Sequence, residues 1–211
     1  MKILCVGYRS WALDIYKQIK KAKNHKVLIL KKVNIKRILN FKPDYLLFYG
    51  WSDMVSDKLI NTGKCIMLHP SKLPLYRGGS PIQNQIIRGV NISAVTLFRM
   101  NKNIDQGNII LQKKISLKGS IDDIFKRITN VGYELTLKML KGNFKEKKQP
   151  KNSKIYKRRR PHESQITLNE IKNKSAKYLY NKIRMLGDPY PNAYILTKDK
   201  RKILLKVVKI K

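Results

Sequence analysis

The feature that most constrains the fold is a regular alternation of short apolar runs with segments of helical spacing. Apolar, β-branched or aromatic runs occupy residues 2–8, 26–30, 44–50, 64–69, 93–100 and 108–117, and helical spacing occupies residues 11–23 and 34–41 between the early runs. Strands that alternate with helices form a parallel sheet, and the connecting helices then cover both of its faces. The sequence therefore predicts an α/β fold built on a mostly parallel sheet.

The later part of the chain contains one strong helix signal and a short tail. Ser120 is a suitable N-cap with Asp123 three residues on, residues 121–135 place their apolar side chains along one stripe, and Gly142 can end the helix. Residues 175–186 repeat an amphipathic pattern, and residues 202–210 are typical of a terminal strand. Because this tail is too short for a core of its own, we predict a C-terminal helix-strand extension that packs on the main domain.

Basic residues dominate the charge. Lys and Arg number 47 against 13 Asp and Glu, so the 211 residues carry a formal net charge of +34. Such a charge attracts polyanions, and nucleic acid, nucleotides and acidic surfaces are candidate partners. Lysine is scattered over nearly every segment, which favours a compositional bias over a dedicated nucleic-acid surface. The densest block, residues 145–161, is predicted to be a solvated connector that is still able to touch phosphates.

Apolar runs and cysteines bear on the compartment. No apolar run is long enough to cross a bilayer, and the N-terminal residues lack the cleavage pattern of a signal peptide. We therefore expect a soluble, cytoplasmic protein with no membrane partner. Cys5 and Cys65 lie inside apolar runs, which is typical of buried, reduced thiols rather than of a disulfide or a metal site. We predict no metal site.

Two acid-base groups follow predicted strands. Ligands of open parallel sheets gather at the carboxyl ends of the strands, where His69 ends the run of residues 64–69. Asp105 lies in the loop after the run of residues 93–100. Each also has a structural interpretation, His69 as a packed and hydrogen-bonded residue and Asp105 as a turn residue before Gly107. Since no G-x-G-x-x-G or P-loop spacing is present, the first strand indicates no dinucleotide or nucleoside triphosphate site.

The motifs around these two residues resemble a known family. The stretches MLHPSKLPLYRGGSPIQNQIIRG, residues 67–89, and SAVTLFRMNKNIDQGNIILQKKISL, residues 93–117, resemble the 10-formyltetrahydrofolate-dependent formyltransferases. That family includes methionyl-tRNA formyltransferase, glycinamide ribonucleotide transformylase and the sugar N-formyltransferases. The resemblance covers residues 41–140 and extends more weakly through residues 158–171 and 183–194. It implies a Rossmann-like domain, 10-formyltetrahydrofolate as co-substrate, and a catalytic set of Asn, His and Asp. His69 and Asp105 match the His and the Asp, whereas Met67 stands at the position of the Asn.

Met67 is the main departure from the family pattern. Loss of one preorganised oxyanion donor costs about 10²–10³ in rate, and a methionine cannot donate a hydrogen bond. Ser71, Asn84 and the backbone N–H groups of residues 77–80 are candidate replacements. In the family, the loop with Pro70, Pro74 and the two glycines borders the cleft, and the pterin is bound by backbone groups before the Asp. The resemblance thus implies a co-substrate site made by Arg77, Gly78, Gly79, Met100, Asn101, Lys102, Asn103 and Ile104.

The resemblance divides the chain and implies its reaction. Residues 1–144 would form the catalytic domain, residues 145–161 the basic connector, and residues 162–211 the short C-terminal extension. The expected activity is formyl transfer to the primary amine of a small molecule, with a nucleotide-linked amino sugar as acceptor. The reason is that methionyl-tRNA formyltransferase carries a full C-terminal β-barrel, whereas this sequence has only a short tail after the connector. Formylation of initiator methionyl-tRNA is an alternative, motivated by the basic residues 154–160. A second alternative is a folate- or nucleotide-sugar-binding protein with reduced catalysis, motivated by Met67. The oligomeric state is not predicted.

Overall fold

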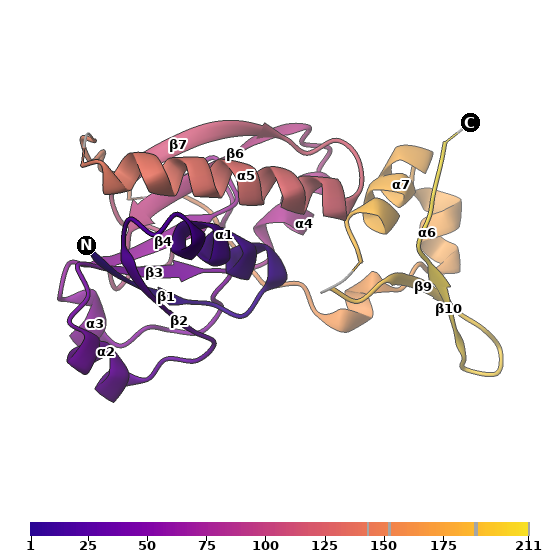
Figure 1. Cartoon of the computed structure of the whole chain (residues 1–211). Coiled ribbons are helices and arrows are strands. Elements are labelled where there is room, and N and C mark those ends of the chain that lie inside the picture. Colours follow the sequence, from indigo (N-terminus) through magenta and orange to yellow (C-terminus); the bar gives the residue numbers. More distant parts are fainter. Residues whose placement is uncertain (143, 152, 188–189, 211) are drawn as a thin grey trace.

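The computed structural model describes residues 1–142, 144–151, 153–187 and 190–210, and its centre is a six-stranded sheet, which can be followed in Figure 1. The strand order is β2-β1-β3-β4-β6-β7, with bounds β1 Lys2–Val6, β2 Lys26–Leu30, β3 Tyr45–Tyr49, β4 Cys65–His69, β6 Ile92–Arg99 and β7 Ile109–Ser116. The first four strands run parallel, β6 is antiparallel to β4, and β7 is antiparallel to β6. The predicted Rossmann-like, mostly parallel sheet is confirmed.

Helices cover both faces of the sheet, as predicted. Successive strand residues point to opposite faces, so Ile3, Cys5, Leu47 and Leu68 join one core while Leu4, Val6 and Phe48 join the other. Helices α1 (Ser10–Lys21) and α5 (Ile121–Leu140) pack on the first face. Helices α2 (Ile35–Phe41) and α3 (Asp57–Ile60) pack on the second. This double burial explains why the strands are almost continuously apolar.

Local sequence signals set several element ends. The Ser120 hydroxyl accepts a hydrogen bond from the Asp123 backbone N–H, and the Asp123 carboxylate accepts one from the Ser120 backbone N–H, so the predicted start of α5 is confirmed. Gly142 follows the helix with φ of +83°. Both thiols are buried and free, and burial raises the pKa of Cys65 to about 11. The predicted burial of both cysteines is therefore confirmed.

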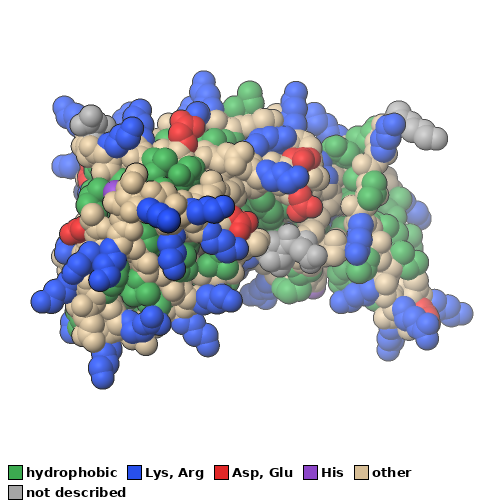
Figure 2. Space-filling model, in the orientation of Figure 1, with side chains coloured by type: hydrophobic (Ala, Val, Ile, Leu, Met, Phe, Trp, Pro, Cys, Tyr) green, Lys and Arg blue, Asp and Glu red, His purple; other side chains and the backbone are tan. Residues whose placement is uncertain are grey.

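Basic side chains are spread widely over the molecule. Figure 2 shows Lys and Arg distributed over the visible face of both the sheet domain and the C-terminal part. They are not gathered into one patch in this view, which agrees with a compositional origin for much of the charge. Within the described residues, no helix is long and apolar enough to cross a membrane.

The prediction of a solvated connector is wrong for part of residues 145–161. Strand β8 (Ile155–Tyr156) pairs in parallel with β5 (Arg77–Gly78), and Lys147 forms a two-bonded bridge with Ile109. The basic residues of this segment are exposed except for the half-buried Arg159, but backbone N–H and C=O groups of the segment bond to the edge of β5 and to the first residue of β7. The amino-acid composition of the segment indicates polar, charged side chains, but it does not reveal these backbone hydrogen bonds.

The C-terminal residues form a small layer at one end of the molecule (Figure 1). It contains a 3-10 turn (Pro161–Ser164), α6 (Leu168–Asn173), α7 (Ala176–Arg184), β9 (Ala193–Leu196) and β10 (Lys202–Leu205). Ile183, Met185 and Leu186 join the α1/α5 core, and Arg184 donates to the carbonyls of Leu117 and Gly119 at 2.7 and 2.9 Å. The last strand is shorter than predicted, and among the described residues it pairs with β9. The three-part division of the chain stays a prediction.

Candidate active site

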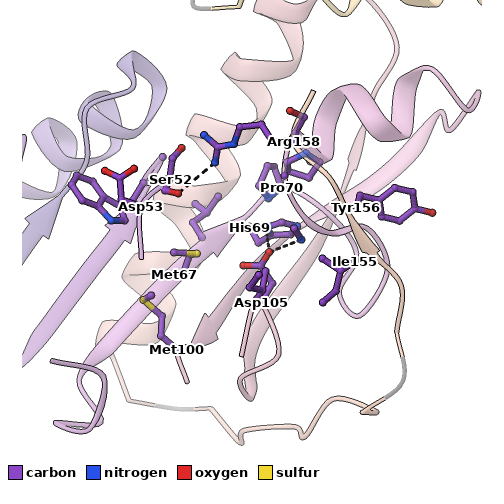
Figure 3. Close-up of a pocket in the computed structure, with 18 of the residues that line it drawn as sticks. Ser52, Asp53, Met67, His69, Pro70, Met100, Asp105, Ile155, Tyr156 and Arg158 are labelled. Carbon is purple, nitrogen blue, oxygen red and sulfur yellow. Dashed lines mark hydrogen bonds and ion pairs between the residues drawn. The ribbon is translucent and has the colours of Figure 1, made fainter. Parts of the chain in front are cut away.

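A cavity of about 550 Å³ opens at the carboxyl ends of the central strands (Figure 3). Its wall contains residues 50–55 after β3, His69 and Pro70 at the end of β4, and the loop of residues 100–105 after β6. Helix α4 (Pro81–Ile86) begins at its edge, and residues 155–159 of the connector close another side. The cavity thus lies where the sheet topology predicts a ligand site.

His69 is held at both ring nitrogens. It is 4% exposed, its Nε2 lies 2.9 Å from the Tyr76 carbonyl oxygen, and its Nδ1 lies 3.4 Å from Asp105 Oδ2. Because a carbonyl only accepts hydrogen bonds, Nε2 carries a proton. When Nδ1 is protonated as well, the ring is an imidazolium that faces a carboxylate. The His69–Asp105 pair can therefore hold or release one proton at the cavity wall.

Asp105 reaches His69 from an unusual backbone conformation. Its φ is +49°, in the left-handed region that non-glycine residues seldom adopt, and its Oδ2 also accepts a hydrogen bond from the Gly78 N–H at 2.8 Å. The side chain is 10% exposed. The carboxylate therefore has two fixed partners, one from the end of β4 and one from β5. The structure thus brings His69 and Asp105 together, and their catalytic roles stay a prediction.

Met67 lines the cavity two residues before His69, on the same face of β4. Figure 3 shows Met67 and Met100 close together on the wall beside the His69–Asp105 pair. Met67 is half-buried and packs against the α2/α3 core. Its thioether offers only a weak acceptor, so this side of the cavity lacks the amide donor that the family resemblance implies.

Three predicted site residues have other partners. Ser71 is fully buried and donates its hydroxyl to the Leu75 carbonyl at 2.6 Å, and the Asn84 amide donates to the Gly79 carbonyl at 2.8 Å. The Arg77 guanidinium is 2% exposed and donates to the Ile104 carbonyl. None of the three is among the described residues that line the cavity. Each of these side chains is bonded to a backbone carbonyl, so the structure lends no support to Ser71 and Asn84 as oxyanion donors or to Arg77 as a co-substrate ligand. These roles stay predictions.

The other predicted co-substrate residues do line the cavity: Gly78, Gly79, Met100, Asn101, Lys102, Asn103 and Ile104. Gly79 is required by close packing, since a Cβ there would lie 2.5 Å from the Arg158 Cα. The glycine pair therefore lets the connector, rather than only a ligand, approach the loop. Contact of these residues with a co-substrate stays a prediction.

Two participants are missing from the sequence prediction. The Tyr76 carbonyl fixes His69, and a backbone acceptor of this kind leaves no signal in the residue type. Arg158 extends from the connector along the cavity and donates to the Ser52 carbonyl at 3.5 Å (Figure 3). The only sequence signal for Arg158 is the run of basic residues around it, and that run predicts a solvated segment. No group of three His, Cys, Asp or Glu side chains suited to a metal ion occurs within the described residues.

Comparison with known proteins gives the class. Residues 6–140 match the family model described as formyl transferase, and the chain belongs to this family. The resemblance predicted from the motifs is thereby confirmed. The methionyl-tRNA formyltransferase of Thermodesulfovibrio yellowstonii is 30% identical over 180 residues, which cover 82% of this chain and 57% of that protein. The chain thus spans little more than half the length of this curated relative.

Solved structures agree on the fold. A methionyl-tRNA formyltransferase from Clostridium thermocellum superposes with a TM-score of 0.91 at 26% identity, covering 100% of this chain and 94% of that one. A likely sugar N-formyltransferase from Mycobacterium tuberculosis superposes with a TM-score of 0.79 at 20% identity, covering 100% of this chain and 98% of that one. The second likeness shows the fold alone.

Proposed function

We propose that this chain transfers the formyl group of 10-formyltetrahydrofolate to a primary amine. Membership of the formyl transferase family supports the reaction class. The observation that carries the proposal is the His69–Asp105 pair, with Nδ1 and Oδ2 3.4 Å apart, in the wall of a cavity also lined by residues 100–104. A folate and an amine have room to meet there, since the cavity has a volume of about 550 Å³.

The reaction needs one proton to move. The amine nitrogen attacks the formyl carbon and forms a C–N bond, which leaves an oxyanion on a tetrahedral carbon. Collapse breaks the bond between that carbon and N10 of the folate, and the proton lost by the amine ends on N10. Asp105, backed by His69, is suited to carry this proton, because one carboxylate oxygen already faces a ring nitrogen that can share it.

Oxyanion stabilisation is the weaker part of the site. Met67 cannot donate, and Ser71 and Asn84 donate to carbonyls instead. We therefore assign the oxyanion to a His69 N–H, which requires the ring to exchange its bond to the Tyr76 carbonyl for one to the formyl oxygen. A slow formyltransferase is the expected result.

Two acceptors remain in competition. Methionyl-tRNA is supported by the sequence relatives and by the basic residues Lys157 and Arg158 at the cavity, which are suited to a phosphate backbone. A nucleotide-linked amino sugar is the acceptor predicted from the sequence, and the fold, which a likely sugar N-formyltransferase shares, is compatible with it. The binding-protein alternative is supported only by Met67.

An acceptor panel tests these alternatives. The protein is incubated with 10-formyltetrahydrofolate and either charged initiator tRNA or a set of nucleotide-linked amino sugars, and the formylated products are identified by mass spectrometry. Formylation of methionyl-tRNA alone removes the sugar proposal, and formylation of a sugar alone removes the tRNA proposal. Absence of transfer to every acceptor, with folate still bound, supports the binding-protein alternative.

A further inference from the structure

We infer that Arg77 and Gln149 are positioning residues that hold Asp105 in the one backbone conformation from which its carboxylate faces His69. Asp105 lies in the loop between β6 and β7, beyond Phe98 and Ile109, where the pairing of these strands ends. The sheet therefore does not fix Asp105 directly. Only the kinetic consequence of this inference rests on the proposed function.

The conformation of Asp105 needs support from its surroundings. A non-glycine residue in the left-handed region costs on the order of 1–3 kcal/mol and persists only where neighbouring groups determine it. The φ of Asp105 is +49°. Since the peptide units on either side of a residue are planar, fixing both planes fixes φ and ψ of that residue. The hydrogen bonds of the two neighbouring carbonyls are therefore the relevant contacts.

Arg77 fixes the peptide plane before Asp105. Its Nε and Nη2 donate to the Ile104 carbonyl at 2.9 and 2.6 Å, and its Nη1 donates to the Ser153 hydroxyl at 2.8 Å. The guanidinium is buried, and its planar fork has a defined direction. Arg77 also directly precedes Gly78, whose N–H donates to the Asp105 carboxylate. One short segment thus binds both the backbone and the side chain of the acid.

Gln149 fixes the peptide plane after Asp105. Its Nε2 donates to the Asp105 carbonyl at 3.0 Å and to the Gly107 carbonyl at 2.7 Å. Gln149 belongs to the connector and lies beyond residue 140, where the match to the family model ends. The bridge of Lys147 with Ile109 and the pairing of β8 with β5 hold the connector on both sides of it. A segment outside the residues that match the family thereby sets the geometry of the acid-base pair.

The test replaces Gln149 by Met, which keeps the length of the side chain and removes the amide. Lys148→Met is the matched control, because Lys148 is the exposed neighbour on the same connector. Asp105→Asn provides the reference for a changed partner of His69, and Arg77→Lys removes the planar fork but keeps the charge. The readouts are the ¹⁵N signals of the His69 ring, which report how its two nitrogens share protons, and kcat for formyl transfer.

We expect Gln149→Met and Arg77→Lys to move the His69 ring signals in the direction set by Asp105→Asn, and to lower kcat by up to about 10²-fold. Lys148→Met leaves both readouts at the parent values. Ring signals of Gln149→Met that match those of Lys148→Met overturn the inference, whatever the change in kcat. Moved ring signals in a protein that transfers no formyl group to any acceptor support the positioning role and reject the proposed function.

Discussion

The two members of the acid-base pair are held in different ways. His69 ends β4, an inner strand paired with β3 on one side and β6 on the other, and its neighbour Leu68 is in the α1/α5 core. Asp105 stands on a loop and depends on hydrogen bonds from Arg77, Gly78 and Gln149. Many contacts within the sheet and the core place His69, whereas a few hydrogen bonds place Asp105.

This contrast separates stability from chemistry. A change beneath His69 removes packing from the core and should lower the stability of the whole domain. A change at Gln149 removes its two hydrogen bonds to the carbonyls of the Asp105 loop and should alter the site while the domain stays folded. The following variants address the two sides in turn.

The largest effect is expected from the pair itself. His69→Asn and Asp105→Asn each remove a proton-carrying group, and we expect kcat to fall by about 10²–10⁴-fold in a formyl-transfer assay. His162→Asn is the control, since His162 is exposed in the C-terminal layer. Equal rates for His69→Asn and His162→Asn would contradict the assigned role.

Restoring the family amide should act in the opposite direction. Met67→Asn places a donor on the cavity wall two residues before His69, and we expect kcat to rise by as much as about 10²-fold. Met67→Leu keeps an apolar side chain of similar size and should leave kcat near that of the parent. A parent rate that neither variant changes would mean that another group already stabilises the oxyanion.

The sheet side of the comparison is tested by stability. Leu68 is 3% exposed, and Gly132 of α5 lies so close to it that an added Cβ there would be 2.7 Å from a Leu68 methyl. Leu68→Ala should lower the free energy of unfolding by about 2–5 kcal/mol in urea denaturation. Gln149→Met should lower the free energy of unfolding much less. A comparable loss in both variants would contradict the difference proposed between the sheet and the loop.

The smallest effect concerns the C-terminal layer and pH. Burial acts to raise the pKa of Glu170, but the hydrogen bonds and charge of Lys182, whose Nζ lies 2.6 Å from Oε1, outweigh it together with hydrogen bonds from Thr167 and Tyr178. The pKa therefore lies below the usual glutamate value. A lowered folded pKa stabilises the protein above the unfolded pKa, and this contribution disappears as the pH falls through the folded pKa. Unfolding at several pH values should therefore show Glu170→Gln less stable than the parent at neutral pH, with the difference shrinking in acid. A difference in the free energy of unfolding that does not change with pH would show that the Glu170–Lys182 ion pair is not its cause.

The sequence predicts those parts of the fold that depend on side-chain polarity. The apolar runs locate the strands, the Ser120 cap locates α5, and the strand ends together with the family motifs bring His69 and Asp105 to one site. Hydrogen bonds from side chains to backbone carbonyls cannot be predicted in this way. Residue type does not reveal that Ser71 and Arg77 are committed to carbonyls, or that the basic connector pairs with β5.

The central claim is that the His69–Asp105 cavity transfers a formyl group to an amine. The most direct measurement follows ¹⁴C-formyl label and tetrahydrofolate release together, with and without acceptor, in the parent protein. We predict one tetrahydrofolate released for each formylated amine, and release only when the acceptor is present. Release of tetrahydrofolate with free formate, or no release with any acceptor, would contradict the account.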